Sequence, residues 1–288
     1  MAKRLTAKKH VNIKTVPGRI ILGIFCWTYA GISLYPILWL LFYSFKSNNE
    51  IFVTNPFGFP RVLRFENYVR AWSEYSVPVY FGNSVFVSVA TVFLTIIFAL
   101  PFSYAVSRMK WRGRGLVRII VSLGMFIPVQ AILIPVARIV NGLNLSSSRF
   151  GLILPYTGIN LAFATLVYYG FFVGLPPELE EAACIDGASV FTCFFRIIVP
   201  LVKPATATLV IYIFLNAWNE FILANVLVVN ERLKTLPLGV LFFQGAFTTD
   251  WGAMGATMVM ASLPTVIIYC VFSKQVENAL TVGAAVKG

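Results

Sequence analysis

The sequence predicts an all-α polytopic membrane protein with six transmembrane helices. Of its 288 residues, 58% are hydrophobic and only 12% are charged, whereas a soluble domain carries about a quarter charged residues. Mean hydropathy is +0.80, and several apolar runs reach the roughly 20 residues needed to cross a bilayer. Because period-two alternation is absent, we expect these runs to be helices and not strands of a closed barrel, the other structure that satisfies its backbone in lipid.

Six apolar runs are the candidate spans. The first follows a basic segment and is longer than the core of a signal peptide, so we expect it to remain uncleaved. The later runs carry internal prolines, which are more frequent in membrane helices than in soluble ones. We divide the chain into a basic tail at 1–19, a six-span domain at 20–274 and a C-terminal tail at 275–288. The runs are Ile20–Phe45, Phe81–Ser107, Leu116–Val140, Gly151–Gly174, Pro204–Val229 and Gly252–Ser273.

The distribution of lysine and arginine predicts the orientation of the spans. An even number of spans places both termini on the same side of the membrane. That side holds 15 of the 23 basic residues, and the opposite side holds 8. Cytoplasmic loops carry the excess of positive charge, so we expect both termini in the cytoplasm. Long outer loops are then expected at Lys46–Tyr80 and Asn230–Asp250.

The sequence lacks the residues of a catalytic or nucleotide-binding centre. His10 is the only histidine and lies in the basic tail, and the four cysteines show no metal-ligand spacing. No phosphate-binding G-x-x-x-x-G-K-[ST] loop occurs. We therefore expect no enzymatic activity, no metal and no cofactor bound by this chain. Its function should be conformational, with energy supplied by another polypeptide.

The cytoplasmic loop at 176–203 predicts a helical hairpin. Pro177 suits the start of a helix, and the three glutamates that follow are favoured by the positive end of the helix dipole. Gly187 is a typical C-terminal stop. A second short helix is expected over Ser189–Val199. From the residues alone, a docking element for another protein and a solvated acidic linker are equally compatible with this hairpin.

A spaced motif in this loop resembles the EAA loop of binding-protein-dependent ABC importers. It consists of Glu181-Ala182-Ala183, Gly187, Ile197 and Val199-Pro200. The family usually has leucine where this chain has Val199. Further segments resemble the carbohydrate-uptake branch, above all the smaller six-span permease of maltose-type importers. These segments are Arg112–Arg114, Gly151–Pro155, Ala217–Phe221, Thr235–Gly239, Asp250–Gly252 and Leu280–Gly288.

The resemblance implies a multi-subunit importer in the bacterial inner membrane. Expected partners are a second homologous permease, two ATPase subunits that bind ATP and Mg, and an extracytoplasmic solute-binding protein. The C-terminal tail would lie near the ATPases. The expected ATPase-coupling residues are Glu181, Ala182, Ala183, Asp186, Gly187 and Pro200. The expected contacts with the binding protein, within the last outer loop, are Phe242, Gln244 and Phe247.

Polar residues within the spans are candidates for the substrate pathway. A carboxylate at membrane depth is costly and marks either a pathway or a paired structural contact. Polar side chains also join membrane helices to one another, so both roles remain open here. The candidates are Asn216, Trp218, Asn219, Glu220, Asn83 and Gln130. The branch resemblance favours a di- or oligosaccharide substrate. A stand-alone secondary transporter or channel is the alternative, and a membrane-embedded enzyme is the third reading.

Overall fold

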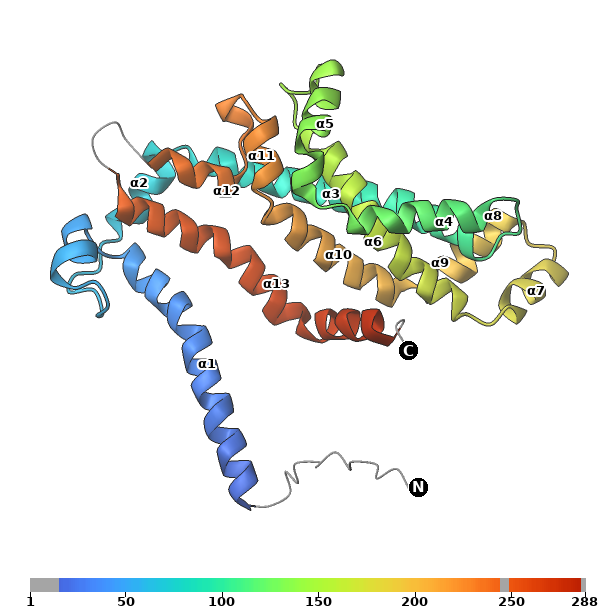
Figure 1. Ribbon diagram of the computed structural model, residues 1–288, viewed down its shortest axis with the longest axis horizontal. Coiled ribbons are helices and arrows are strands. Elements are labelled where there is room, and N and C mark those ends of the chain that lie inside the picture. Colours follow the sequence, from blue (N-terminus) through green and yellow to red (C-terminus); the bar gives the residue numbers. More distant parts are fainter. Residues whose placement is uncertain (1–15, 244–248, 286–288) are drawn as a thin grey trace, which may run out of the picture.

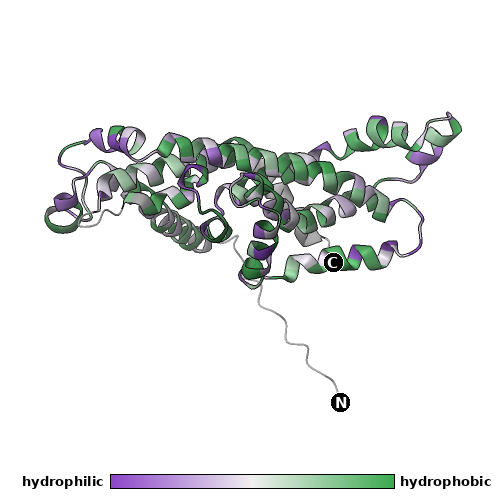
Figure 2. Ribbon diagram, turned by 90° about the horizontal axis from the view of Figure 1, so that it is seen from above, coloured by the Kyte–Doolittle hydropathy of each residue, from purple (hydrophilic) through white to green (hydrophobic). Residues whose placement is uncertain are grey.

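The computed structural model describes residues 16–243 and 249–285, and within them the chain is helical with no β-strand (Figure 1). Among these described residues, four helices are long and apolar enough to cross a membrane: α1 (Val16–Ser44), α3 (Val77–Ser107), α6 (Phe150–Val173) and the first part of α13 (Trp251–Ala285). Two bent helix pairs bring the number of spans to six if each pair counts as one. Hydrophobic residues predominate along the helices, and hydrophilic residues are more frequent at the helix ends and in the connecting segments (Figure 2).

The third span is broken. Helix α4 (Arg114–Leu123) and the 3-10 turn η2 (Gly124–Phe126) meet α5 (Val129–Gly142) at an angle of 107°. The break has a local cause, because proline disfavours a helical residue before it and has no N–H to donate. Ile127, which precedes Pro128, is accordingly extended, with ψ 114°. The prediction of one continuous helix over Leu116–Val140 was therefore wrong.

The fifth span is also not one straight helix: the chain bends before α10 and breaks after it. Before it, a chain of short helical pieces meets α10 (Lys203–Trp218) at 71°. After Trp218 the helix stops, and a separate helix, α11, covers Ile222–Leu227. The predicted continuous run over Pro204–Val229 was wrong, because Glu220 starts a new helix there, as described below. The short pieces are α8 (Val190–Cys193), the π-helix η3 (Phe194–Ile198) and α9 (Val199–Leu201).

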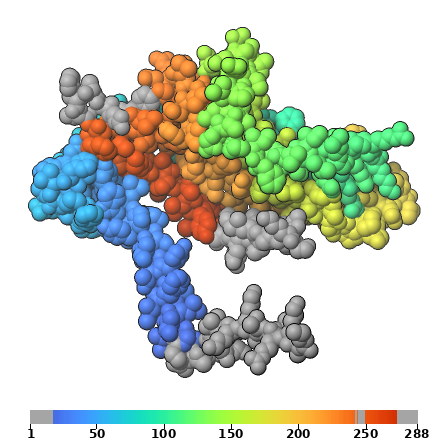
Figure 3. Space-filling view, viewed as in Figure 1, coloured from blue at the N-terminus to red at the C-terminus, as the bar shows by residue number. Residues whose placement is uncertain are grey.

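Helix α6 lies at the centre of the bundle, packed against α3 and α10. Half of its most apolar stretch is buried within this chain, whereas the corresponding stretch of α1 is 0% buried. Helix α1 projects away from the other spans (Figures 1 and 3). It joins the body through its last turns, where Gly255 of α13 comes so close that a Cβ would lie 2.4 Å from the ring of Tyr43. The apolar sides of α1 thus remain available to lipid or another protein.

The remaining elements lie at the ends of the spans. Helix α13 is longer than the predicted last span, and it is interrupted at Phe272, where φ is −113° and ψ is 21°. The segment assigned as a C-terminal tail is thus helical as far as Ala285. The other elements are η1 (Glu50–Thr54), α2 (Glu66–Glu74), α7 (Glu178–Ile185), η4 (Glu231–Leu233), α12 (Leu236–Gly239) and η5 (Val240–Phe243).

Candidate functional site

Helix α7 forms the predicted first helix of the hairpin. It begins directly after Pro177 and has three glutamates in its first turn. The predicted stop at Gly187 is confirmed, since this residue has a φ of +75°, which glycine adopts at little cost. The Gly187 N–H donates to the Cys184 carbonyl at 3.1 Å, and the Ala188 N–H donates to the Ala183 carbonyl at 2.9 Å. These two bonds form a Schellman motif, which satisfies carbonyls that have no helical partner.

The two faces of α7 have opposite surroundings. Ala183 is only 4% exposed and packs in a core cluster with side chains of α3, α6, η3 and α10. On the other face, Ile185 is 86% exposed. Of the six residues expected to couple to an ATPase, Ala183 therefore points into this chain. The other five are exposed: Glu181, Ala182, Asp186, Gly187 and, farther along in α9, Pro200.

A group of hydrogen bonds around Arg108 fixes the position of α7. The Arg108 side chain forms an ion pair with Glu180, with an N–O distance of 2.7 Å, and its Nε donates to the same carboxylate at 2.8 Å. The Tyr104 hydroxyl donates to the other oxygen of Glu180 at 2.8 Å. The guanidinium also donates to the Leu175 carbonyl at 3.0 Å, just beyond the end of α6. Helices α3, α6 and α7 are thus joined through one side chain.

This ion pair is partly shielded from water. The Arg108 and Glu180 side chains are 11% and 24% exposed, so their attraction is screened less than that of a surface pair. Sequence reasoning missed both roles, since Arg108 was counted only as a cytoplasmic cation and Glu180 only as a dipole-favoured glutamate. Their separation of 72 residues offers no local pattern that could have paired them.

The polar residues at the end of α10 have definite partners in this chain. The Trp218 indole N–H donates to the Ala261 carbonyl of α13 at 3.0 Å, and the ring is buried. The Asn216 amide donates to Asn160 of α6 at 3.0 Å. Asn219 is exposed, and its amide donates to a carbonyl of its own helix. Trp218 thus joins two helices, while Asn216 and Asn219 still face outward from the chain.

The Glu220 carboxylate connects two helices. Its carboxylate accepts the Tyr156 hydroxyl of α6 and the backbone N–H groups of Leu223 and Ala224, the latter two at 2.7 and 3.0 Å. The first N–H groups of a helix have no intrahelical partner, and a carboxylate is favoured at that positive end. Glu220 therefore starts α11 and ties it to α6. This arrangement explains its presence within an apolar stretch without a substrate.

The other two pathway candidates differ from each other. Asn83 in α3 is 2% exposed, and its amide donates to the Arg232 and Lys234 carbonyls at 2.8 and 3.0 Å. Its oxygen accepts from the Arg149 guanidinium at 2.9 Å. Asn83 thus holds the segment that precedes α12 against α3. Gln130 is exposed in the first turn of α5, directly after the 107° bend.

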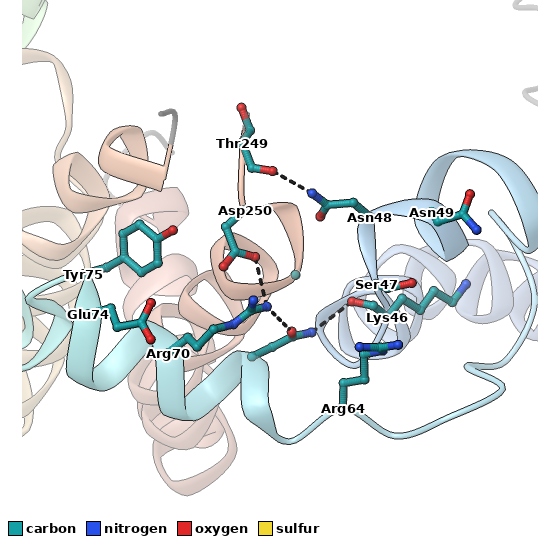
Figure 4. A pocket seen from close by; sticks show the side chains of 12 residues that line it. Lys46, Ser47, Asn48, Asn49, Arg64, Arg70, Glu74, Tyr75, Thr249 and Asp250 are labelled. Atoms are coloured by element: carbon teal, nitrogen blue, oxygen red, sulfur yellow. Dashed lines mark hydrogen bonds and ion pairs between the residues drawn. The ribbon is translucent and has the colours of Figure 1, made fainter. Parts of the chain in front are cut away.

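A polar cleft of about 610 Å³ opens at the other end of the molecule from α7 (Figures 1 and 4). Its walls come from the segment after α1, from α2 and from the start of α13. Asp250 pairs with Arg70 at 3.3 Å, and the Asn48 amide donates to the Thr249 carbonyl at 2.8 Å. Burial raises the pKa of Tyr75, and the Asp250 carboxylate raises it further.

The three residues expected to contact a binding protein precede, in the sequence, Thr249 and Asp250, which line this cleft. Phe242 belongs to η5, but its side chain is not among those described. Gln244 and Phe247 lie outside the described residues. Their role stays a prediction.

Comparisons with a family model and with related proteins agree on one family. Residues 91–282 match the family model described as "Binding-protein-dependent transport system inner membrane component". The chain is 35% identical, over 87% of its length and 88% of the relative's, to the sulfoquinovosyl glycerol transport system permease protein SmoH of Agrobacterium fabrum. It is 32% identical to the trehalose/maltose transport system permease protein MalG of Thermococcus litoralis, covering 92% of this chain and 96% of the relative.

Solved structures show the same fold. The chain resembles a crystal structure of a bacterial ABC transporter involved in the import of the acidic polysaccharide alginate, with a TM-score of 0.80 and 25% identity. That match covers 90% of this chain and 98% of the other.

The hydrogen bonds of Glu220 lead to a prediction about stability. Glu220→Gln removes one of two acceptor oxygens, so we expect the purified protein to lose roughly 1–3 kcal/mol, the cost of leaving a partly buried polar group unpaired. Tyr156→Phe should destabilise by a similar amount, and the double variant by less than the sum of the two. Asn219→Asp, a carboxamide–carboxylate exchange at an exposed neighbouring position, is the control. Thermal unfolding measures these effects, and an unchanged melting temperature in Glu220→Gln would contradict the structural role.

Proposed function

Because the chain belongs to the family of binding-protein-dependent transport system inner membrane components, we propose that it is one permease subunit of an ATP-binding-cassette importer for a carbohydrate. It would form half of the translocation pathway and couple that pathway to ATP hydrolysis on separate subunits. The observation that carries the coupling role is the two-sided α7, which is bound firmly to the bundle on one face and exposes Ile185 on the other.

The proposed substrate class follows from the relatives. Those named above are described as permeases for sulfoquinovosyl glycerol and for trehalose or maltose, and another, from Streptomyces coelicolor, for diacetylchitobiose. A di- or oligosaccharide, or a glycoside of similar size, is therefore the substrate that we propose. Asn216, Asn219 and Gln130 are the candidates to face it, because their side chains are exposed on this chain and would line a cavity shared with a second permease.

The exposed apolar surfaces support a paired permease. No residue in the most apolar stretch of α1 is buried within this chain, and a single subunit would open one side of any polar pathway to lipid. We propose a second, homologous permease as the partner that closes it. ATP and Mg would be bound by ATPase subunits that receive α7, with no cofactor held by this chain. The solute-binding protein would dock at the opposite end, over the polar cleft beside Asp250.

A stand-alone secondary transporter is the weaker candidate. Such a protein needs an ionisable residue at membrane depth whose charge can respond to an ion or proton. Glu220, which directly follows Asn219 at the end of α10, is the candidate for such coupling. Its carboxylate oxygens, however, already accept hydrogen bonds from Tyr156 and from the first N–H groups of α11. Its geometry is that of a helix cap.

Reconstitution tests the proposed function. We expect the chain alone in liposomes to carry no sugar, and the complete set of second permease, ATPases and loaded binding protein to carry it only with ATP. Uptake of radiolabelled maltose and chitobiose is a suitable readout. Sugar uptake by the chain alone, driven by a proton or sodium gradient, would favour the secondary transporter instead.

Ile185 tests the docking face of α7. A charged residue at this 86% exposed position would have to be desolvated in a protein groove, so Ile185→Asp should weaken ATPase binding by about 2 kcal/mol or more. Ile185→Leu keeps the apolar contact and should bind normally. Co-purification of the ATPase with membrane-inserted permease measures this. Equal recovery of ATPase with Ile185→Asp and wild type would contradict the proposed docking face.

The Arg108–Glu180 pair tests whether α7 must be held to α3. We expect Arg108→Gln and Glu180→Gln each to lower the sugar transported per ATP hydrolysed several-fold, because α7 could then move without the bundle. The two changes should be strongly non-additive, since each removes the same contact. Arg196→Gln removes an exposed cation from the same loop and is the matched control. If the double variant loses the full sum of both effects, the pair does not act as a unit.

A further inference from the structure

The turn between α3 and α4 concentrates positive charge without any acidic residue. Five of the eleven residues at 108–118 are lysine or arginine, and none is aspartate or glutamate. Two of the five are already engaged: Arg108 pairs with Glu180, and Arg118 lies over the ring of Tyr169, 4.8 Å from its centroid. Three cations, Lys110, Arg112 and Arg114, remain exposed, and none of them forms an ion pair among the described residues.

These three cations surround a common hollow. They line, together with Trp111, a shallow depression of about 450 Å³. The backbone makes this possible at Gly113, whose φ of +88° lets the chain reverse between Arg112 and Arg114. The Arg114 guanidinium is held by the Met109 carbonyl at 3.0 Å. The hollow is therefore a shallow, open surface with three positive charges, of a size that accepts a phosphate-bearing headgroup.

The surroundings place this hollow at the boundary between lipid and water. The Trp111 indole N–H donates to the Ala105 carbonyl at 2.9 Å while the residue stays 40% exposed, and tryptophan favours the membrane interface. Directly beyond the turn, α4 presents outward-facing apolar side chains, with Leu116 64% and Ile120 59% exposed. An acyl chain could thus run along α4 while its headgroup reaches the cations.

We propose that this turn is a binding site for an anionic phospholipid, with the lipid phosphate held by Lys110, Arg112 and Arg114 and the acyl chains against α4. The cytoplasmic placement of the turn rests on the function proposed above, and that leaflet carries the anionic lipids. A docked ATPase is the competing occupant. Lipid is favoured because exposed apolar residues continue from the hollow along α4, a helix of the third span.

Native mass spectrometry of the purified full-length chain tests the site. Phosphatidylglycerol or phosphatidylcholine is titrated into the detergent-solubilised protein, and bound lipid is counted. We expect wild type to prefer phosphatidylglycerol. The triple variant Lys110→Gln, Arg112→Gln, Arg114→Gln should lose most of that preference, because the three cations that attract the net negative charge of phosphatidylglycerol are removed.

Two control variants separate charge from folding. Arg196→Gln removes one cation elsewhere in the cytoplasmic loops and should leave the preference unchanged. The charge-preserving triple Lys110→Arg, Arg112→Lys, Arg114→Lys should retain it. Equal binding of both lipids by wild type, or an undiminished preference in the glutamine triple, would overturn the proposal.

Two further arms identify the occupant. Glycerol phosphate added at the concentration of the lipid should not displace phosphatidylglycerol; displacement would show a soluble phosphate site and overturn the lipid assignment. The glutamine triple should also keep its ATPase during co-purification. Loss of the ATPase with lipid binding intact would make the turn a protein contact. Because lipid binding in detergent requires neither transport nor a defined side of the membrane, its failure is distinguishable from failure of the proposed function.

Discussion

The contact between Arg108 and Glu180 determines the shape of the end of the molecule that carries α7. Helix α6 ends with carbonyls that have no helical partner, and a cation is favoured at that negative end. Arg108, directly after the neighbouring helix α3, donates to the Phe172 carbonyl in the last turn of α6 and to the Leu175 carbonyl just beyond it, and it also pairs with the Glu180 carboxylate. A single guanidinium therefore completes the end of one helix and orients the next.

The sequence was sufficient to predict features that depend on local composition. Apolar runs predicted where the spans lie, and Pro177 and Gly187 predicted that α7 begins after the proline and ends before the glycine. Breaks inside a span were not predicted, because the hydropathy of an apolar run does not report whether the helix axis changes direction within it. Pro128 carried a usable signal, since the residue before proline avoids the helix, but prolines at other positions in the spans remain inside continuous helices.

The candidate site was less accessible from sequence, because its essential contacts are distant in the chain. Glu220 is notable as a carboxylate in an apolar run, yet the choice between pathway and structural contact depends on Tyr156, 64 residues away. Asn83 likewise meets Arg232 across 149 residues. In both cases an expensive polar group is fully occupied by helix ends and loops. Glu220 and Asn83 thus hold irregular backbone in place beside the interrupted spans.

The contacts of α7 explain how so short a helix keeps a fixed position on the bundle. Its eight residues span about 12 Å, and isolated helices of that length are marginal in water. Its order must therefore come from Ala183 in the core, from the Schellman bonds at Gly187 and from the Arg108–Glu180 pair. All three lie on the side toward the bundle or at the helix end. The exposed face with Ile185 makes none of these three contacts, so in the proposed importer it would be free to bind the ATPase, and a displacement of α7 would be passed to α3 and α6 together.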